Sequence, residues 1–204
     1  MNSIQFRLGL LMSSILATRE RLIRAAQDEL VAGNGHLEMQ AVAKRAQVSV
    51  GLAYHHFGSK AGLIASVVDD FYETLEAAVF YETKWPATSW EEGEKGRVGA
   101  YIGFHYAHPF APLVIGPLSR ASEVLDVETA FTNRQLEGGA QMLMAAQREG
   151  ILEDSIDPHL TIALMIGGIR QALIFAMARE QRPAPEKLTD DVWQFMAAAL
   201  RLKR

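Results

Sequence analysis

The residues in this sequence that could do chemistry are chiefly histidines. His105 and His108 lie three positions apart, a spacing that lets two imidazoles on one helix share a metal ion. A protein metal site of this kind needs a further ligand, and none stands out near the pair. The 204-residue chain has no cysteine, which rules out a zinc-thiolate site and a disulfide framework. The sequence therefore predicts neither a bound metal nor a cofactor.

Catalytic patterns are also missing from the rest of the sequence. The chain offers no nucleophile beside a base, no glycine-rich phosphate loop and no pair of carboxylates with a catalytic spacing. Each of these patterns is needed by a large class of enzymes. The sequence therefore predicts that the protein is not an enzyme.

The most informative stretch runs from Glu38 to Lys60 and is predicted to form two short helices. The first helix has an apolar face with spacings of three and four, formed by Met39, Val42, Ala43 and Ala46. Ser49 can cap a second helix that runs to about His56. Two short helices joined by about three residues form a helix-turn-helix, whose second helix enters the major groove of DNA.

The second helix and the residues after it resemble the signature of the TetR family of transcriptional regulators. The matching pattern is Val48-Ser49-x-Gly51-x-x-Tyr54-x-His56-Phe57-x-Ser59-Lys60-x-x-Leu63, with Val42-Ala43-x-x-Ala46 upstream. The resemblance implies an all-α fold of about nine helices, in which an amino-terminal three-helix bundle with the helix-turn-helix precedes a larger helical domain for ligand binding and dimerisation. Gln47 stands where the family often has a glycine, so a strained turn or a different turn is expected there.

Two groups of residues are predicted to contact DNA. The first approaches the base edges and consists of Ser49, Val50, Gly51 and Leu52 at the start of the second helix, with Met39 and Gln40 on the first. Gln40 is the best candidate for a bidentate contact to a base, and Val50 and Leu52 could touch thymine methyls. The second group resembles the family's phosphate-contacting positions and consists of Tyr54, His55, His56 and Lys60.

The charge distribution supports a nucleic-acid partner although the net charge of the chain is −4. Residues 1–60 carry seven Lys or Arg against four Asp or Glu, a net charge of +3, which leaves −7 on residues 61–204. A basic amino-terminal module on an acidic body lets one end meet phosphates while the other stays away from them. The expected partner is double-stranded operator DNA.

Helix signals divide the sequence into three parts. Residues 1–17 are expected to be a flexible or weakly helical extension, residues 18–60 the DNA-binding domain and residues 61–204 the ligand-binding and dimerisation domain. A helix from residue 59 to about 82 would connect the two domains.

Side chains that can cap helices mark the individual helix starts. Thr18, Ser89 and Asp157 are each expected to precede a helix, the last one running to about Gln181. Thr189 is expected to open the final helix, through Leu200.

The last two helices are apolar on more than one side and must bury more than one face. The resemblance implies that this helix pair forms a four-helix interface between two copies of the chain. The predicted homodimer interface comprises Leu164, Gly167, Gly168, Gln171, Trp193, Met196 and Leu200.

Aromatic and histidine side chains in the second part of the chain suggest a pocket for a small molecule. One group lies near the end of a helix, and a second group lies on later helices that could face it. Together the predicted ligand-binding residues are Tyr101, Phe104, His105, His108, Phe110, Met142, Arg170, Gln171 and Phe175. A mostly apolar pocket of this kind suits a hydrophobic ligand.

The sequence is expected to belong to a cytoplasmic protein that does not enter a membrane. The apolar run from Ile162 to Ile174 is interrupted by Arg170 and is too short to span a bilayer. The function predicted overall is a DNA-binding repressor that leaves its operator when a small apolar effector binds. The alternative is a DNA-binding regulator that is controlled by a protein partner or by no ligand.

Overall fold

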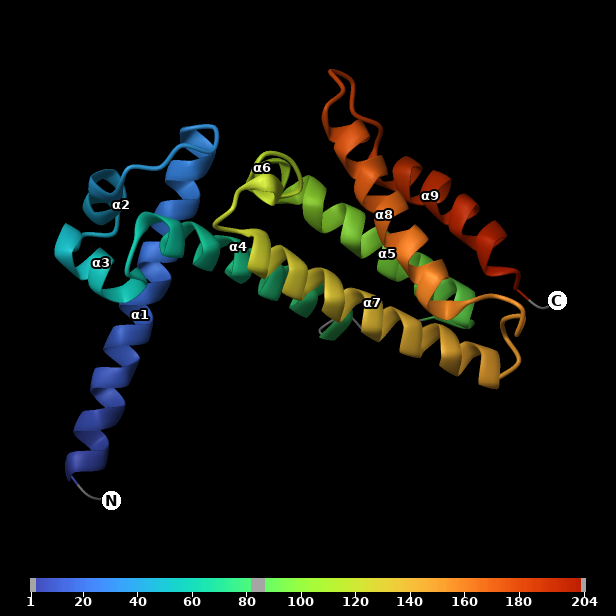
Figure 1. The fold of residues 1–204 in the computed structure, drawn as a ribbon, viewed down its shortest axis with the longest axis horizontal. Helices are drawn as coiled ribbons and strands as arrows, with labels where there is room; N and C mark the ends of the chain where they lie inside the picture. Colours follow the sequence, from blue (N-terminus) through green and yellow to red (C-terminus); the bar gives the residue numbers. More distant parts are fainter. Residues whose placement is uncertain (1–2, 82–86, 203–204) are drawn as a thin grey trace.

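The computed structural model describes residues 3–81 and 87–202. Within these residues the chain forms nine α-helices and no strand, which confirms the all-α prediction (Figure 1). The helices are α1 (Ser3–Ala32), α2 (Met39–Arg45), α3 (Val50–Phe57), α4 (Lys60–Glu76), α5 (Trp90–Ala107), α6 (Ala111–Ile115), α7 (Leu125–Arg148), α8 (Pro158–Met177) and α9 (Pro185–Leu200). A π-helical turn, Ala77–Tyr81, continues α4, and a 3₁₀ turn, Leu118–Arg120, follows α6.

The helices form two groups joined by α4. Helices α1, α2 and α3 lie together at one end of the molecule, and α5 to α9 form the larger body at the other (Figure 1). Helix α1 packs on α2 and α4, while the body is held by the pairs α7 with α8 and α5 with α9. Helix α4 begins beside α3 and runs into the body beside α7 (Figure 1). Any change in the direction of α4 would therefore move the two groups relative to each other.

Helix α1 is longer than the sequence signals suggest. It begins at Ser3 instead of at a cap on Thr18, so residues 3–17 continue the helix. These residues contain no proline and are rich in leucine and other helix formers. Extending an existing helix costs much less than nucleating a new one, so a possible cap at Thr18 does not stop it. The amino-terminal half of α1 projects away from the other helices (Figure 1).

Most of the predicted helix starts are capped as expected. The Ser49 hydroxyl accepts from the backbone N–H of Leu52 at 3.2 Å, and the Ser89 hydroxyl accepts from the N–H of Glu92 at 3.2 Å. The Asp157 carboxylate accepts from two backbone N–H groups of α8, at 2.9 and 3.2 Å. These caps fix where α3, α5 and α8 start.

The predicted end of α8 and the predicted start of α9 are wrong. Helix α8 ends at Met177 instead of near Gln181, and α9 starts at Pro185, four residues before Thr189. The fixed backbone angle of a proline suits the first position of a helix, where its missing N–H is not needed. The hydroxyl of Thr189 instead donates to the backbone carbonyl of Pro185 at 2.8 Å, inside the first turns of α9.

Candidate DNA interface and internal cavity

The helix-turn-helix is held by the small apolar residues that the sequence indicated. Val42, Ala43 and Ala53 are at most 1% exposed, and Val48 and Phe57 pack against this core. The turn between α2 and α3 contains Gln47 at a φ of 56°, a left-handed conformation that costs a non-glycine residue more than a glycine. The strain expected at Gln47 is therefore present.

The prediction that Met39 contacts DNA is wrong. Its side chain is 6% exposed and belongs to the core between α1 and α2. Gln40, the next residue, is exposed, because successive side chains point about 100° apart around a helix. Lys44 is also exposed and lies one turn after Gln40 on the same face of α2. The spacing of four could have identified Lys44 as a candidate, but the sequence prediction left it out.

The outer face of α3 is open. A side chain at Gly51 would meet nothing within 4 Å, Leu52 is 37% exposed and Tyr54 is 45% exposed. His55 is exposed, whereas His56 is half-buried with its ring centroid 6.1 Å from that of Phe57. His56 and Val50 therefore lie partly against the core, whereas Leu52, Tyr54 and His55 present their side chains outward.

Several basic residues of this region are already paired. Arg45 contacts Glu29 at 2.7 Å and Asp28 at 3.6 Å, and the guanidinium of Arg19 lies 5.6 Å from the centre of the Phe57 ring. Lys44 and Lys60 are exposed and have no ion pair with the described residues. The ammonium groups available to a phosphate therefore belong to Lys44, near the end of α2, and to Lys60, at the start of α4. These two residues lie on either side of α3 in the sequence.

The body contains a cavity of about 390 Å³ between α4, α5, α7 and α8. Two of the predicted ligand residues, Tyr101 and Met142, line it. Apolar side chains from three helices supply much of the remaining wall, including Val98, Phe131, Ile162, Met165 and Ile169. This volume lies in the range of roughly 300 to 1,000 Å³ that is usual for small-molecule sites.

Two ion pairs in the wall of this cavity were not predicted. Arg97 contacts Glu94 at 2.6 Å, and Arg134 contacts Glu76 at 3.1 Å. Burial raises the pKa of the Glu94 carboxyl, an effect that the nearby Arg97 opposes. Gln135 also donates to Glu76, at 3.2 Å. Charged residues at these positions looked like ordinary solvent-facing helix residues, because only the packing of α4 and α5 against α7 brings them to the cavity.

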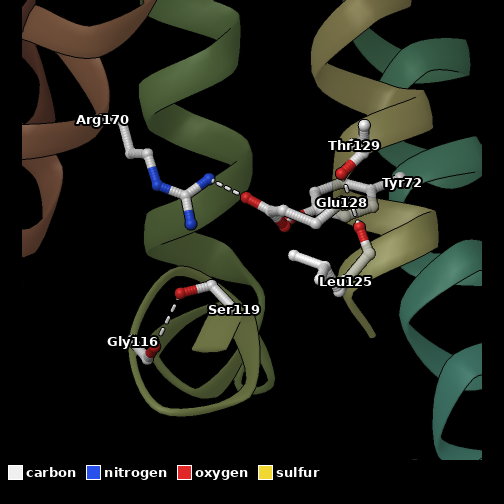
Figure 2. Close-up of polar contacts among 7 residues, drawn as sticks. All are labelled: Tyr72, Gly116, Ser119, Leu125, Glu128, Thr129 and Arg170. Atoms are coloured by element: carbon white, nitrogen blue, oxygen red, sulfur yellow. Dashed lines mark hydrogen bonds and ion pairs between the residues drawn. The ribbon is translucent and has the colours of Figure 1, made fainter. Parts of the chain in front are cut away.

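A second cavity of about 350 Å³ adjoins the first, and Arg170 lines it as predicted for a ligand residue. Arg170 on α8 is paired with Glu128 on α7, and that carboxylate also accepts from the hydroxyl of Tyr72 on α4. Figure 2 shows Arg170 reaching Glu128 with the Tyr72 ring behind the carboxylate. Burial and the hydrogen bond to Glu128 raise the pKa of Tyr72, so its hydroxyl stays a donor. Three helices thus meet at one carboxylate.

Four predicted ligand residues do not line either cavity. They pack around the buried ring of Phe71 on α4, with ring centroids 5.0 to 6.0 Å away: Phe104, His105, His108 and Phe110. Phe110 is fully buried. The side chains gather because they fill the space between α4 and α5, so they are core residues that join the body to the connecting helix.

His105 is fully buried within this aromatic cluster. Its Nδ1 lies 2.8 Å from the backbone oxygen of Tyr101, which only accepts, so Nδ1 carries the proton. Its Nε2 is buried without a partner, and burial lowers the pKa of the ring to about 4. Burial also lowers the pKa of His108, whose Nε2 lies 3.4 Å from the amide nitrogen of Gln27 on α1.

Two further ligand predictions are wrong because the side chains point outward. Phe175 is 66% exposed and Gln171 is exposed as well. Both lie on the outer face of α8 together with three predicted dimer residues, Leu164, Gly167 and Gly168. The face is apolar and includes Leu160 and Leu164, which are 59% and 64% exposed.

The dimer residues predicted on α9 face the wrong way. Trp193, Met196 and Leu200 are at most 6% exposed because they pack inside the body, where α9 lies against α5 and α8. The exposed apolar residue of α9 is Phe195, at 66%. A strongly apolar sequence showed that both sides of α9 are used, but it did not show which side faces inward.

Length and composition alone would allow α8 to cross a membrane, and it is the one helix in the described ranges for which this holds. This is weak evidence, because core helices of soluble proteins share those properties. The paired Arg170 in its middle and its packing on α7 and α9 fit a helix of the body.

Comparison with known proteins agrees with this architecture. Residues 22–67 match the family described as "Bacterial regulatory proteins, tetR family". No curated protein matches the sequence.

Solved structures of similar fold cover almost the whole chain. The fatty acid degradation regulator FadR from Bacillus halodurans is 19% identical with a TM-score of 0.73, over 91% of this chain and 97% of its own. NalD from Pseudomonas aeruginosa, a secondary repressor of the MexAB-OprM multidrug efflux pump, is 15% identical with a TM-score of 0.70, over 94% and 98%. At these identities the likeness concerns the fold. Together these comparisons show that residues 22–67 form a DNA-binding domain of the TetR family and that the whole chain has the fold of TetR-family regulators.

Proposed function

We propose that this DNA-binding regulator is a repressor that binds its operator as a homodimer and is released by a small, largely apolar ligand. The observation that carries the proposal is the connection of two features through α4, namely the open outer face of α3 and the internal cavity of the body. Among structural relatives, NalD is described as a repressor, which supports the same role here.

The DNA contacts proposed are those of α3 and its flanks. Gln40, Val50 and Leu52 would approach base edges, and the residues that grip phosphates would be Tyr54, His55, Lys44 and Lys60. The amides at the start of α3 add a partial positive charge that favours phosphate. His56 is proposed to brace the helix, since half of its ring lies against the core.

The dimer contact proposed is the outer face of α8 with the exposed side of α9. Leu160, Leu164 and Phe175 follow one stripe of α8, and Phe195 adds to it from α9. Gly167 and Gly168 would allow a second helix to approach closely, because a side chain added at either position meets nothing within 4 Å. Regulators of this family usually act as dimers, and a dimer would hold two copies of α3 about one turn of DNA apart.

The coupling proposed between ligand and DNA runs through hydrogen bonds between α4 and α7. Tyr72 donates to Glu128, and Glu76 accepts from Arg134 and Gln135, so two turns of α4 are tied to the wall of the cavity. At its other end α4 is capped by Ser59, whose hydroxyl accepts from the N–H of Gly62 at 2.9 Å beside α3. A ligand that favours a shifted α7 would favour a different direction of α4 and a different spacing of the α3 helices.

Selection of DNA fragments by the purified protein tests the DNA-binding part. We expect an operator with two related half-sites about one helical turn apart, and affinity that falls as the salt concentration rises. Binding without sequence preference, or without dependence on salt, would contradict the proposal. A monomer at the concentration where the operator is bound would contradict the dimer.

Thermal stability measured against a set of small molecules tests the ligand part. A ligand that binds the folded state raises the melting temperature, and the same ligand should release the operator. If none of a chemically broad set does both, the alternative of control by a protein partner, or of no control by a ligand, is favoured. The protein is expected to act in the cytoplasm, where its DNA is.

A further inference from the structure

The charged side chains that line the two cavities are balanced one for one. Among the described residues they are three guanidinium groups, on Arg97, Arg134 and Arg170, and three carboxylates, on Glu94, Glu76 and Glu128. Each guanidinium contacts one of the carboxylates. Each of these charged groups is therefore already paired, and none is left to pair with a charged ligand.

This balance disfavours a charged ligand. A carboxylate or an ammonium moved from water into a largely apolar site loses part of its hydration, and it regains that energy only from an opposite charge that is free to pair with it. Here a ligand anion at Arg97 would have to displace Glu94, and a ligand cation at Glu94 would have to displace Arg97. Either exchange leaves a half-buried protein charge without its partner.

The hydroxyl of Tyr101 is a polar group that remains available in the wall of both cavities. Tyr101 lines both cavities and so lies where they join, beside the pair formed by Arg170 and Glu128. Its hydroxyl has no hydrogen-bond partner among the described residues, and burial raises its pKa to about 12, which keeps it neutral. The Nε of Arg97 also lacks a partner, but protein atoms cover it, which puts it out of reach of a ligand.

Apart from its paired charges, much of the wall of the main cavity is apolar. Val98 lies one helical turn before Tyr101 on α5, and Met142, Ile162 and Met165 come from α7 and α8. A hydrocarbon or aromatic group of a ligand would lose its contact with water against these side chains, which is the main source of affinity in such sites.

We propose that the effector is an uncharged, largely apolar molecule with one hydroxyl or carbonyl group, which forms a hydrogen bond with the hydroxyl of Tyr101. A phenol both donates and accepts, so it serves an alcohol and a ketone, ester or amide equally well. This inference rests on the proposed control by a ligand and adds the chemical class of that ligand.

Three probes of equal chain length test the class: 1-octanol, octanoate and octylammonium, each titrated into the full-length protein at neutral pH and followed by calorimetry. We expect 1-octanol to bind at least tenfold more tightly than either charged probe, about the cost of burying one charge that is only partly compensated. Tighter binding of octanoate or octylammonium, or no binding of 1-octanol, overturns the proposal.

A pair of tyrosine variants tests the contact. Tyr101→Phe should weaken binding of 1-octanol about two- to tenfold, the usual value of one neutral hydrogen bond, without changing affinity for the operator. Tyr106→Phe is the matched control, since Tyr106 lies on the same helix, lines neither cavity and has a buried hydroxyl without a partner. If both variants weaken the binding of 1-octanol equally, or if neither variant weakens it, the assignment of Tyr101 is wrong.

Removing one charge at a time tests the role of charge balance. Glu94→Gln leaves Arg97 without its carboxylate and should raise the affinity for octanoate at least tenfold, whereas Arg97→Gln should do the same for octylammonium. An unchanged ranking of the probes in both variants contradicts the argument from balance.

Operator release by the same probes separates the two proposals. If octanoate binds best and releases the operator, the proposed function stands and the chemical class is wrong. If 1-octanol binds through Tyr101 and the operator stays bound, the chemical class stands and the proposed control by a ligand is wrong.

Discussion

The DNA-binding end and the body of this regulator differ in how their functional side chains are positioned. At the DNA-binding end, the candidate residues Gln40, Tyr54 and Lys60 are exposed on α2, on α3 and at the start of α4, and each would act from its own place in the sequence. In the body, functional groups come in pairs from different helices, as Glu128 does with Arg170 and Tyr72. The effects of two substitutions should therefore be additive on the DNA-binding surface and non-additive between paired residues of the body.

The largest effect is expected at Gly62, where the backbone of α4 lies close to the backbone of α3. A Cβ at Gly62 would lie 2.3 Å from the backbone oxygen of Phe57, at the junction of α3 and α4. Gly62→Ala should therefore lower the free energy of unfolding by roughly 3 kcal/mol and abolish operator binding, because the backbone itself must move.

Chemical denaturation and operator binding measure this effect, with Gly103→Ala as the control. A Cβ at Gly103 meets nothing within 4 Å, and an alanine inside a helix is more stable than a glycine by roughly 0.5 to 1 kcal/mol. If both variants gain stability, the approach at Gly62 is not as close as the structure indicates.

The next largest effect concerns the coupling between the paired residues Arg170 and Glu128 in the body. Arg170→Met leaves the carboxylate of Glu128 half-buried without its counter-charge, which should lower the free energy of unfolding by about 2 to 3 kcal/mol. The double variant Arg170→Met/Glu128→Gln removes both charges, keeps an acceptor for the hydroxyl of Tyr72 and should recover most of that loss. Urea denaturation of the two variants and the wild type measures the coupling, and additive losses would contradict the pairing.

Acid should destabilise the body through His105. The folded state has a pKa of about 4 for this ring, below the value of about 6.5 in the unfolded chain, so unfolding takes up a proton as the pH falls through this window. The stability present above pH 6.5 should therefore decrease by about 2 kcal/mol per chain between pH 7 and pH 5. In His105→Phe that part of the slope should be absent, and an unchanged slope would show that other groups cause it.

The smallest effects are expected on the DNA-binding surface. Lys60→Ala should weaken binding to all sequences by about 1 kcal/mol and lower the salt dependence by about one phosphate contact, without changing stability. Gln40→Ala should instead cost about 1 to 3 kcal/mol at one base pair and relax the preference there. Binding measured on a set of single-base operator variants distinguishes them, and a uniform loss from Gln40→Ala would exclude a base contact.

The difference between the two regions also explains which predictions from sequence succeeded. Val42, Ala43 and Ala53 follow a short-range pattern, so their burial could be predicted from spacing alone, as could the caps at Ser49 and Asp157. The placement of Met39 failed because one position along a helix turns a side chain by about 100°, which is enough to move it from the surface to the core.

In the body, residue type was a poor guide to role. His105 and Phe110 were predicted as ligand residues but fill the core around Phe71, whereas Glu76 and Arg97 line the cavity and were not predicted as ligand residues. Tyr101, Met142 and Arg170 do line the cavities, and their contact with a ligand stays a prediction. The choice between these roles depends on which helix packs against which, over separations of tens of residues in the chain.

The sequence by itself determined that the chain is all-helical, that it carries a helix-turn-helix of the TetR family and where α3, α5 and α8 begin. These properties depend on contacts within a few residues, which periodicity and capping residues record directly. Tertiary structure alone decided that Trp193 and Met196 face inward, that Phe175 faces outward and that three ion pairs line two adjoining cavities. A side chain's surroundings are set by neighbouring helices as well as by its own, and the periodicity of one helix contains no information about its neighbours.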